Sequence, residues 1–141
     1  MISRILELLT FFTISLLFLP RIEAVTKCVR AHGQVHCATD VFRHEKVKIS
    51  LYDHDSLPWE SDDLMGRTYS DDEGRFMVEG CGDDFGPWNE PDPYIVVEHR
   101  CPLQGHTVAI TRRKTIAEVW KTFMPQETNV GVIRLDLNQD G

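Results

Sequence analysis

The sequence predicts an all-β fold, a β-sandwich of about seven to eight strands with at most one short helix. Two observations predict it. The chain beyond residue 24 consists of short runs in which apolar and polar residues alternate, as they do in strands with one buried face. Clusters of Gly, Pro, Asn and Asp separate these runs roughly every 8–15 residues, which is the turn spacing of sandwiches.

The first 24 residues differ from the rest of the chain. Arg4 provides a positive charge, Ile5–Leu19 is an almost wholly apolar run, Pro20 ends it, and Ala24 offers a small residue for cleavage. This order is typical of a secretory signal peptide. A membrane-spanning helix needs about 20 apolar residues, more than this run has. We therefore predict a signal peptide over residues 1–24 and a secreted, extracellular protein.

The remainder, residues 25–141, has the length of one domain. The chain has 15 Lys and Arg against 22 Asp and Glu, a net charge of −7. Nucleic acid is an unsuitable partner for such a chain, because binding phosphates requires basic residues. No second long apolar run follows the first, so no membrane span is expected in this domain.

The cysteines predict two disulfides. An even number behind a signal peptide indicates paired cysteines. Zinc ligands usually occur in close pairs such as C-x2-C, whereas these residues lie 9, 44 and 20 positions apart. The sequence therefore predicts no metal and no cofactor, and the residues alone leave the pairing open. The cysteines are Cys28, Cys37, Cys81 and Cys101.

Four strands are expected in the first half of the domain. The second alternates cleanly, with Val47, Ile49 and Leu51 on one side, as in a half-buried strand. Between the third and fourth, Gly74 suits a turn position with positive φ, and Ser70 or Asp71 can hydrogen-bond the turn backbone. The four runs are Cys28–Cys37, Lys46–Tyr52, Leu64–Ser70 and Arg75–Glu79.

Three strands are expected in the second half, and one stretch is ambiguous. In residues 115–123, Thr115 and Glu118 have the spacing of a helix capping box. The same residues also fit an irregular strand, and both interpretations stay open. The expected strands are Tyr94–Glu98, Thr107–Thr111 and Gly131–Leu137.

Five motifs occur in order between Val29 and Cys101. They are V-x-x-x-G-x-V-x-C from Val29, V-K-I-x-L-Y-D-x-D from Val47, D-D-L-M-G-x-T from Asp62, D-x-x-G-x-F-x-V-x-G from Asp71, and D-P-Y-I-x-x-x-H-x-C from Asp92. Together they resemble the nematode transthyretin-like family.

The resemblance implies a transthyretin-like (prealbumin) sandwich of two four-stranded sheets, D-A-G-H and C-B-E-F. In it, the strands would be A 28–37, B 46–53, C 64–70, D 75–80, E 93–99, F 106–112 and H 130–137. That topology places the start of strand A beside the end of D, and the A–B connection beside the end of E. A disulfide needs Cα atoms about 4.4–6.8 Å apart. The pairing that the resemblance implies is Cys28–Cys81 and Cys37–Cys101.

The same fold also carries 5-hydroxyisourate hydrolase, which uses histidines, an arginine and a C-terminal Tyr-Arg-Gly-Ser. This sequence ends Leu-Asn-Gln-Asp-Gly, and its six histidines are scattered, with only His32 and His36 sharing one strand face. No nucleophile elbow, Cys–His pair or P-loop is present. We expect an extracellular binding protein with no catalytic residues and an unknown ligand or receptor. A hydrolase of the hydroxyisourate type and a structural or host-interaction protein are the alternatives.

Aromatic residues in two polar loops form the candidate binding patch: Trp59 in the acidic loop after the second strand, and Phe85 and Trp88 in the Gly- and Pro-rich loop 80–93. Such residues either fix a loop to the sandwich or form a contact surface. The partner classes expected are an extracellular protein, a lipid head group or a small apolar ligand. The oligomeric state is left open.

Overall fold

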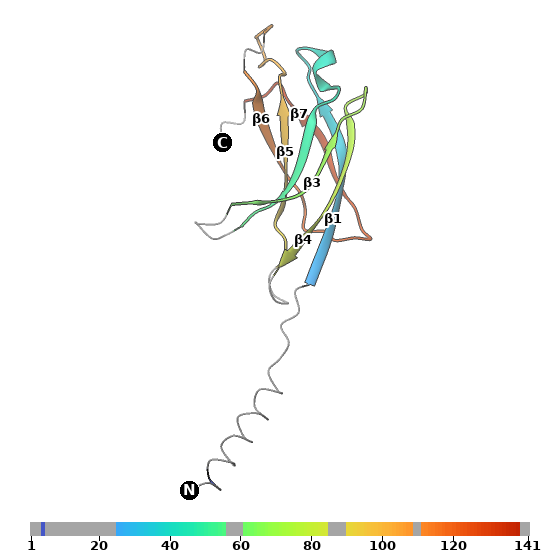
Figure 1. Cartoon of the computed structure of the whole chain (residues 1–141). Helices are drawn as coiled ribbons and strands as arrows, with labels where there is room; N and C mark the ends of the chain where they lie inside the picture. Colours follow the sequence, from blue (N-terminus) through green and yellow to red (C-terminus); the bar gives the residue numbers. More distant parts are fainter. Residues whose placement is uncertain (1–3, 5–24, 56–60, 85–89, 109–110, 139–141) are drawn as a thin grey trace.

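The structure, a computed structural model, describes residue 4 and residues 25–55, 61–84, 90–108 and 111–138. Within them the chain forms a two-layer β-sandwich with one short 3₁₀ helix, as predicted (Figure 1). No described helix has the length and apolar character needed to cross a membrane. The elements are β1 (Val25–His36), η1 (Val41–His44), β2 (Lys48–Asp53), β3 (Asp63–Tyr69), β4 (Arg75–Asp84), β5 (Pro93–His99), β6 (Arg113–Glu118) and β7 (Thr128–Arg134).

The strands form two sheets. Sheet 1 has the order β4-β1-β7, and sheet 2 the order β3-β2-β5-β6. Every pairing in sheet 2 is antiparallel, and β1 pairs antiparallel with β4 but parallel with β7. Sheet 2 therefore matches the expected order C-B-E-F.

The last strand corrects the expected order of sheet 1. β7 lies directly beside β1, which is the place of strand G, so the assignment of 130–137 to strand H is wrong. Over the described residues this sheet has three strands instead of four. Beyond β7 the carbonyl oxygens of Leu135 and Leu137 accept hydrogen bonds from the Arg113 guanidinium, at 3.2 and 2.8 Å. These side-chain contacts occupy carbonyl groups that a longer strand would pair with a neighbour.

Strand F also lies later than expected. Residues 107, 108, 111 and 112 are not in a strand, and β6 begins at Arg113. The ambiguous stretch 115–123 is strand as far as Glu118 and irregular afterwards, with no helix. The ladder with β5 explains this outcome, because it pairs Val96 with Ile116 and Tyr94 with Glu118. A helix at 115–123 would leave the outer side of β5 without that partner.

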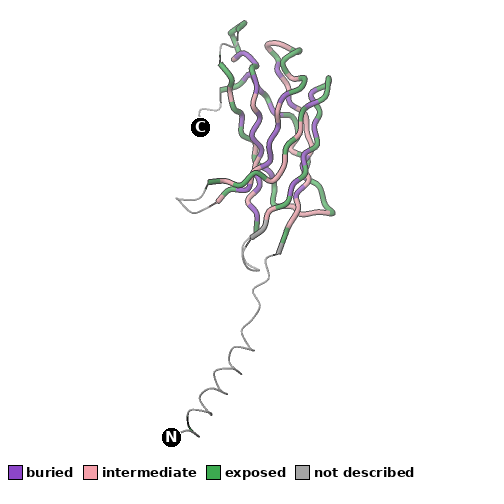
Figure 2. Tube along the Cα trace, viewed as in Figure 1, coloured by how far each residue is buried: buried purple, intermediate pink, exposed green. Residues whose placement is uncertain are grey.

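The core lies between the sheets and follows the predicted alternation (Figure 2). Val47, Ile49 and Leu51 all face inward and are buried. Burying an aliphatic side chain of this kind contributes about 1.5–3 kcal/mol, so these inward faces hold the sandwich together. The core residues on β1, β4 and β5 are Val29, Ala31, Val35, Phe76, Val78, Ile95 and Val97.

Two disulfides link the strands, with the pairing that the resemblance implies. Cys28–Cys81 joins directly opposed residues of β1 and β4. Cys37–Cys101 joins the end of β1 in sheet 1 to the chain just after β5 in sheet 2, and its Cα atoms are 5.8 Å apart. The second disulfide therefore connects the two layers, and both of its cysteines are fully buried.

Two glycines bring the sheets together at one edge. A Cβ atom at Gly66 of β3 would overlap the carbonyl oxygen of Glu79, and one at Gly80 of β4 would overlap that of Met65. Strands β3 and β4 belong to different sheets, yet here their backbones touch without side chains between them. Glycine is required at both positions because any side chain would separate the strands.

Candidate binding site

The aromatic patch predicted from the sequence falls outside the described part of the chain. Trp59, Phe85 and Trp88 all lie in segments that the structure does not describe, so that patch stays a prediction. The histidines that could have suggested catalysis are described. His32 and His36 both lie on β1, where His32 is 3.6 Å from Glu127 and His36 stacks on His44 with 6.2 Å between ring centroids.

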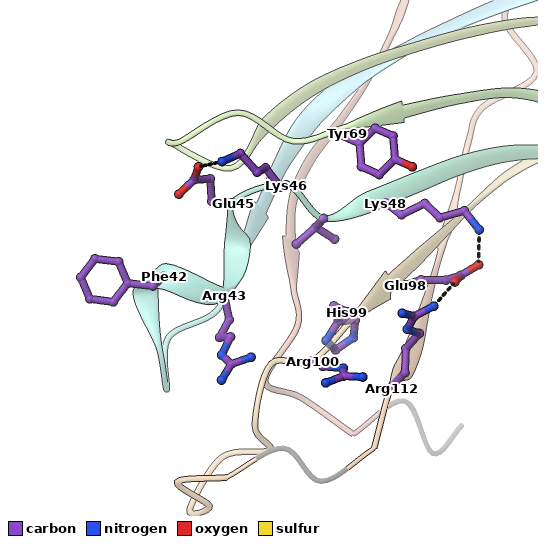
Figure 3. Close-up of a pocket in the computed structure, with 11 residues that line it drawn as sticks. Phe42, Arg43, Glu45, Lys46, Lys48, Tyr69, Glu98, His99, Arg100 and Arg112 are labelled. Carbon is purple, nitrogen blue, oxygen red and sulfur yellow. Dashed lines mark hydrogen bonds and ion pairs between the residues drawn. The ribbon is translucent and has the colours of Figure 1, made fainter.

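A cationic pocket of about 460 Å³ opens at one end of sheet 2 (Figure 3). It lies where η1, the start of β2 and the end of β5 meet. Five cationic side chains line it against two carboxylates, although the chain as a whole carries a net charge of −7. The charged lining residues are Arg43, Lys46, Lys48, Arg100, Arg112, Glu45 and Glu98.

The 3₁₀ helix places Arg43 at this pocket. Asp40 caps the helix by accepting a hydrogen bond from the backbone N of Phe42, at 3.1 Å, and its other oxygen accepts one from Arg43 Nε, at 3.2 Å. The short turn also leaves the ring of Phe42 83% exposed beside the pocket. A capped turn of this kind holds its side chains in a defined position.

Buried Ser70 fixes the segment between η1 and β2. Its hydroxyl accepts a hydrogen bond from Val47 N at 2.8 Å and donates one to the carbonyl oxygen of His44 at 2.6 Å. Lys46, between them, has a positive φ of 53° and donates its backbone N–H to Ser70 O at 3.1 Å. The predicted turn role falls to Asp71 instead, which accepts hydrogen bonds from Glu73 N and Arg75 N. Gly74 has the expected positive φ, 77°.

The charges of the pocket are unequally neutralised. Glu98 accepts a hydrogen bond from Lys48 Nζ at 2.9 Å and lies 3.6 Å from Arg112, and the Lys48 contact lowers the pKa of Glu98. Lys46 forms an ion pair with the adjacent Glu45, at 3.0 Å. Arg100 makes no hydrogen bond or ion pair to any residue that the structure describes. Its guanidinium is therefore the charge most available to a ligand.

His99 lies at the back of the pocket and is uncharged at neutral pH. Its Nδ1 accepts a hydrogen bond from Cys101 N at 3.1 Å, so the proton is on Nε2, 2.9 Å from the Thr115 hydroxyl. Burial, together with the nearby charge of Arg113, lowers the pKa of His99 to about 4. His99 thus positions the strand end and adds no positive charge to the pocket.

The guanidinium groups of Arg43, Arg100 and Arg112 gather around the same opening although they come from three separate segments (Figure 3). Sequence reasoning missed this site. The sequence has two short stretches rich in basic residues, 43–48 and 112–114. Nothing local shows that these stretches meet, or that Arg100 lies beside them. Among the described residues no group of three His, Cys, Asp or Glu side chains could hold a metal ion.

The fold and the site together define a class of protein, a disulfide-linked β-sandwich with a cationic pocket at one end. Residues 32–119, well over half of the chain, match the family model described as the transthyretin-like family. The chain belongs to the transthyretin-like family.

Two further comparisons add little. No curated protein matches the chain. Among solved structures, a 9R-lipoxygenase from Cyanothece PCC8801 is similar at 16% sequence identity and a TM-score of 0.45. That similarity covers 87% of this chain but 20% of the lipoxygenase, so this chain spans about a fifth of that protein's length.

Proposed function

We propose that the protein is a secreted extracellular binding protein, without enzymatic activity, that holds an anionic group of its ligand in the cationic pocket. One observation carries the proposal: five cationic side chains line a single pocket of an acidic chain. Charge of the opposite sign to the whole protein, gathered at one place, indicates electrostatic recognition.

The chemistry of the pocket favours a phosphate, sulfate or carboxylate group. A guanidinium donates two parallel hydrogen bonds to such a group, and Arg100 has no competing partner among the described residues. Arg43 and Arg112 are half or more exposed and flank the same opening. Of the expected partner classes, a protein with an acidic segment or a lipid head group suits these charges better than a small apolar ligand.

Secretion is supported by two features. The N-terminal segment has the order of a signal peptide, and the domain contains two disulfides. Disulfides persist in oxidising compartments and are rare in the cytosol. Sequencing the N-terminus of protein recovered from the culture medium of expressing cells tests this part. We expect a start at Val25, and retention of the protein inside the cells would contradict it.

Calorimetric titration with inorganic pyrophosphate at constant ionic strength tests the pocket. We expect Arg100→Gln to weaken binding about tenfold, because a charge-assisted hydrogen bond is lost. Arg67→Gln is the matched control, since Arg67 on β3 is exposed and lies outside the pocket. Equal loss in the two variants would show a general charge effect and contradict a site at Arg100.

The absence of catalysis has its own test. The decay of 5-hydroxyisourate is followed by absorbance with and without the purified protein. We expect the same rate in both samples. A protein-dependent acceleration would replace the binding proposal with the hydrolase alternative.

A further inference from the structure

A second concavity lies at the opposite end of sheet 2. It is a groove of about 930 Å³ at the start of β5, the end of β6 and the segment that follows β6. The register of the sheet separates it from the cationic pocket, because Tyr94 pairs with Tyr52 here whereas Glu98 pairs with Lys48 at the pocket end. The two sites therefore do not share lining residues.

One wall of the groove is an aromatic ring held in a fixed position. Tyr94 stacks on Tyr52, with 5.7 Å between ring centroids, and donates its hydroxyl to Asp62 at 2.5 Å. Asp62 also lies 3.1 Å from His54 Nδ1, and the hydrogen bond from Tyr94 lowers the pKa of its carboxyl. With its hydroxyl bonded and one face stacked, Tyr94 is pre-organised before any ligand arrives.

Two large apolar side chains of the groove are exposed. Trp120 is 80% exposed and Ile116 is 56% exposed. Exposed apolar surface that is gathered in a concavity, next to polar groups, marks a site of interaction.

Glu118 is the unpaired charge of this groove. It pairs in register with Tyr94 across β5 and β6, and it makes no hydrogen bond or ion pair to any other described residue. The other carboxylates here have partners: Asp62 has Tyr94 and His54, and Asp92 has Lys121 at 2.6 Å. Glu118 is exposed at the end of β6, so its carboxylate is accessible to a cationic ligand and has no described ion pair to give up.

We propose that this groove is a second ligand site, for a small organic cation with an ammonium group on an aromatic or alkyl body. The ammonium lies against the Glu118 carboxylate, and the body packs on Tyr94, Ile116 and Trp120. An indole face attracts an ammonium group as well, through its ring quadrupole. This site has the opposite charge preference to the cationic pocket and does not depend on it.

Phenethylammonium is the probe, with the neutral 2-phenylethanol as the compound of matched shape and the anionic 3-phenylpropanoate as the compound of opposite charge. Each is titrated into the purified protein and followed by NMR. For the cation we expect a dissociation constant on the order of 0.1–1 mM, in keeping with its few heavy atoms. The shifts should include the Trp120 indole. The alcohol should bind about tenfold more weakly, and the anion should not saturate.

Charge variants separate the ammonium contact from simple apolar binding. Glu118→Gln keeps the shape of the side chain and should weaken binding of the cation about two- to fivefold, because the carboxylate is exposed, and should leave the affinity for the alcohol unchanged. Asp72→Asn, in the exposed turn before β4, removes the same charge elsewhere and should change neither affinity. Trp120→Ala should weaken both probes, because the body of the ligand loses its contact.

Three outcomes would overturn the proposal. The anion could bind as tightly as the cation, or Glu118→Gln could weaken cation and alcohol equally. The groove signals could also change with protein concentration and not with the probe, which would mean that a second copy of the chain covers the groove. Binding of pyrophosphate in the cationic pocket is measured separately, so failure of one site leaves the other standing.

Discussion

The guanidinium of Arg134 forms two hydrogen bonds to the carboxylate of Asp136, from Nε to Oδ1 at 2.9 Å and from Nη2 to Oδ2 at 2.7 Å. Asp136 is completely buried, whereas the Arg134 side chain is 41% exposed. Alternation alone would place both side chains outside the sandwich. The chain bends after β7 and turns the carboxylate inward, where the ion pair fixes the end of the last strand.

The ion pair between Arg134 and Asp136 makes the free energy of unfolding depend on pH in the acid range. The hydrogen bonds from Arg134 lower the pKa of Asp136 to about 2, against an ordinary value of 3.8. The unfolded chain therefore takes up the proton first, so the stabilisation is complete above about pH 4 and is lost as the pH falls towards 2. We expect a loss of about 1–2 kcal/mol over this range, reduced by solvent screening at the exposed Arg134.

Urea unfolding measured from pH 2 to pH 7 checks this prediction. Asp136→Asn should flatten the acid side of the curve, and Asp72→Asn, at an exposed carboxyl, should leave it unchanged. If the Asp136→Asn variant lost as much unfolding free energy on acidification as the unaltered protein, the role of the Arg134–Asp136 pair would be contradicted.

His99 should make the free energy of unfolding depend on pH as well, at higher pH than Asp136 does. Its pKa in the folded protein is about 4, mainly because the ring is buried, against 6.5 in the unfolded chain. Between these values only the unfolded state is protonated, so the stabilisation is present above pH 6.5 and is lost as the pH falls to 4. The expected loss is about 3 kcal/mol.

NMR titration of the histidine ring protons checks it directly. The His99 signal should keep the shift of a neutral ring at pH 5. A His99 midpoint near 6.5 would show that burial does not act as described.

Gly66→Ala should destabilise the fold strongly. The added methyl would overlap the carbonyl oxygen of Glu79, which is backbone and cannot rotate away. We expect a loss of about 3 kcal/mol in urea unfolding. Gly105→Ala is the comparison: it has a positive φ of 86° but nothing within 4 Å, so only the backbone strain of about 1 kcal/mol is expected. Equal losses would contradict the contact between β3 and β4.

The two disulfides should differ in their resistance to reduction. Cys37 and Cys101 are fully buried, whereas Cys81 is exposed and Cys28 is partly exposed. Under native conditions a mild thiol should therefore open Cys28–Cys81 first, because exchange requires attack on an accessible sulfur. Alkylation followed by peptide mapping gives the order, and prior opening of Cys37–Cys101 would contradict it.

Local patterns in the sequence located most of the strands but did not show which strands pair with each other. The run Tyr94–Glu98 lies within β5, and Gly74 has the positive φ expected of it. In contrast, Thr107–Thr111 alternates as a strand should, yet β5 pairs with Arg113–Glu118 instead. Which of two adjacent runs pairs with β5 depends on contacts between distant residues, and these are not visible in either run.

The cationic pocket could not be predicted for the same reason. Arg43 and Arg100 lie far apart in the sequence, and only the placement of η1 next to the end of β5 brings them together. The organic-cation groove depends on the same kind of information. Trp120 lies in the stretch 115–123, which the sequence leaves open between helix and strand, and its exposure follows from where β6 ends.

The contact of Gly66 and Gly80 with the opposite backbone makes the two long edges of the sandwich unequal. On the β3–β4 side the distance between the sheets is set by main-chain atoms and cannot widen to admit larger interior residues. On the side of β6 and β7, side chains set that distance. Enlarging an interior side chain near β6 and β7 should therefore cost less stability than the same change beside β3, because side chains can adjust where main-chain atoms cannot.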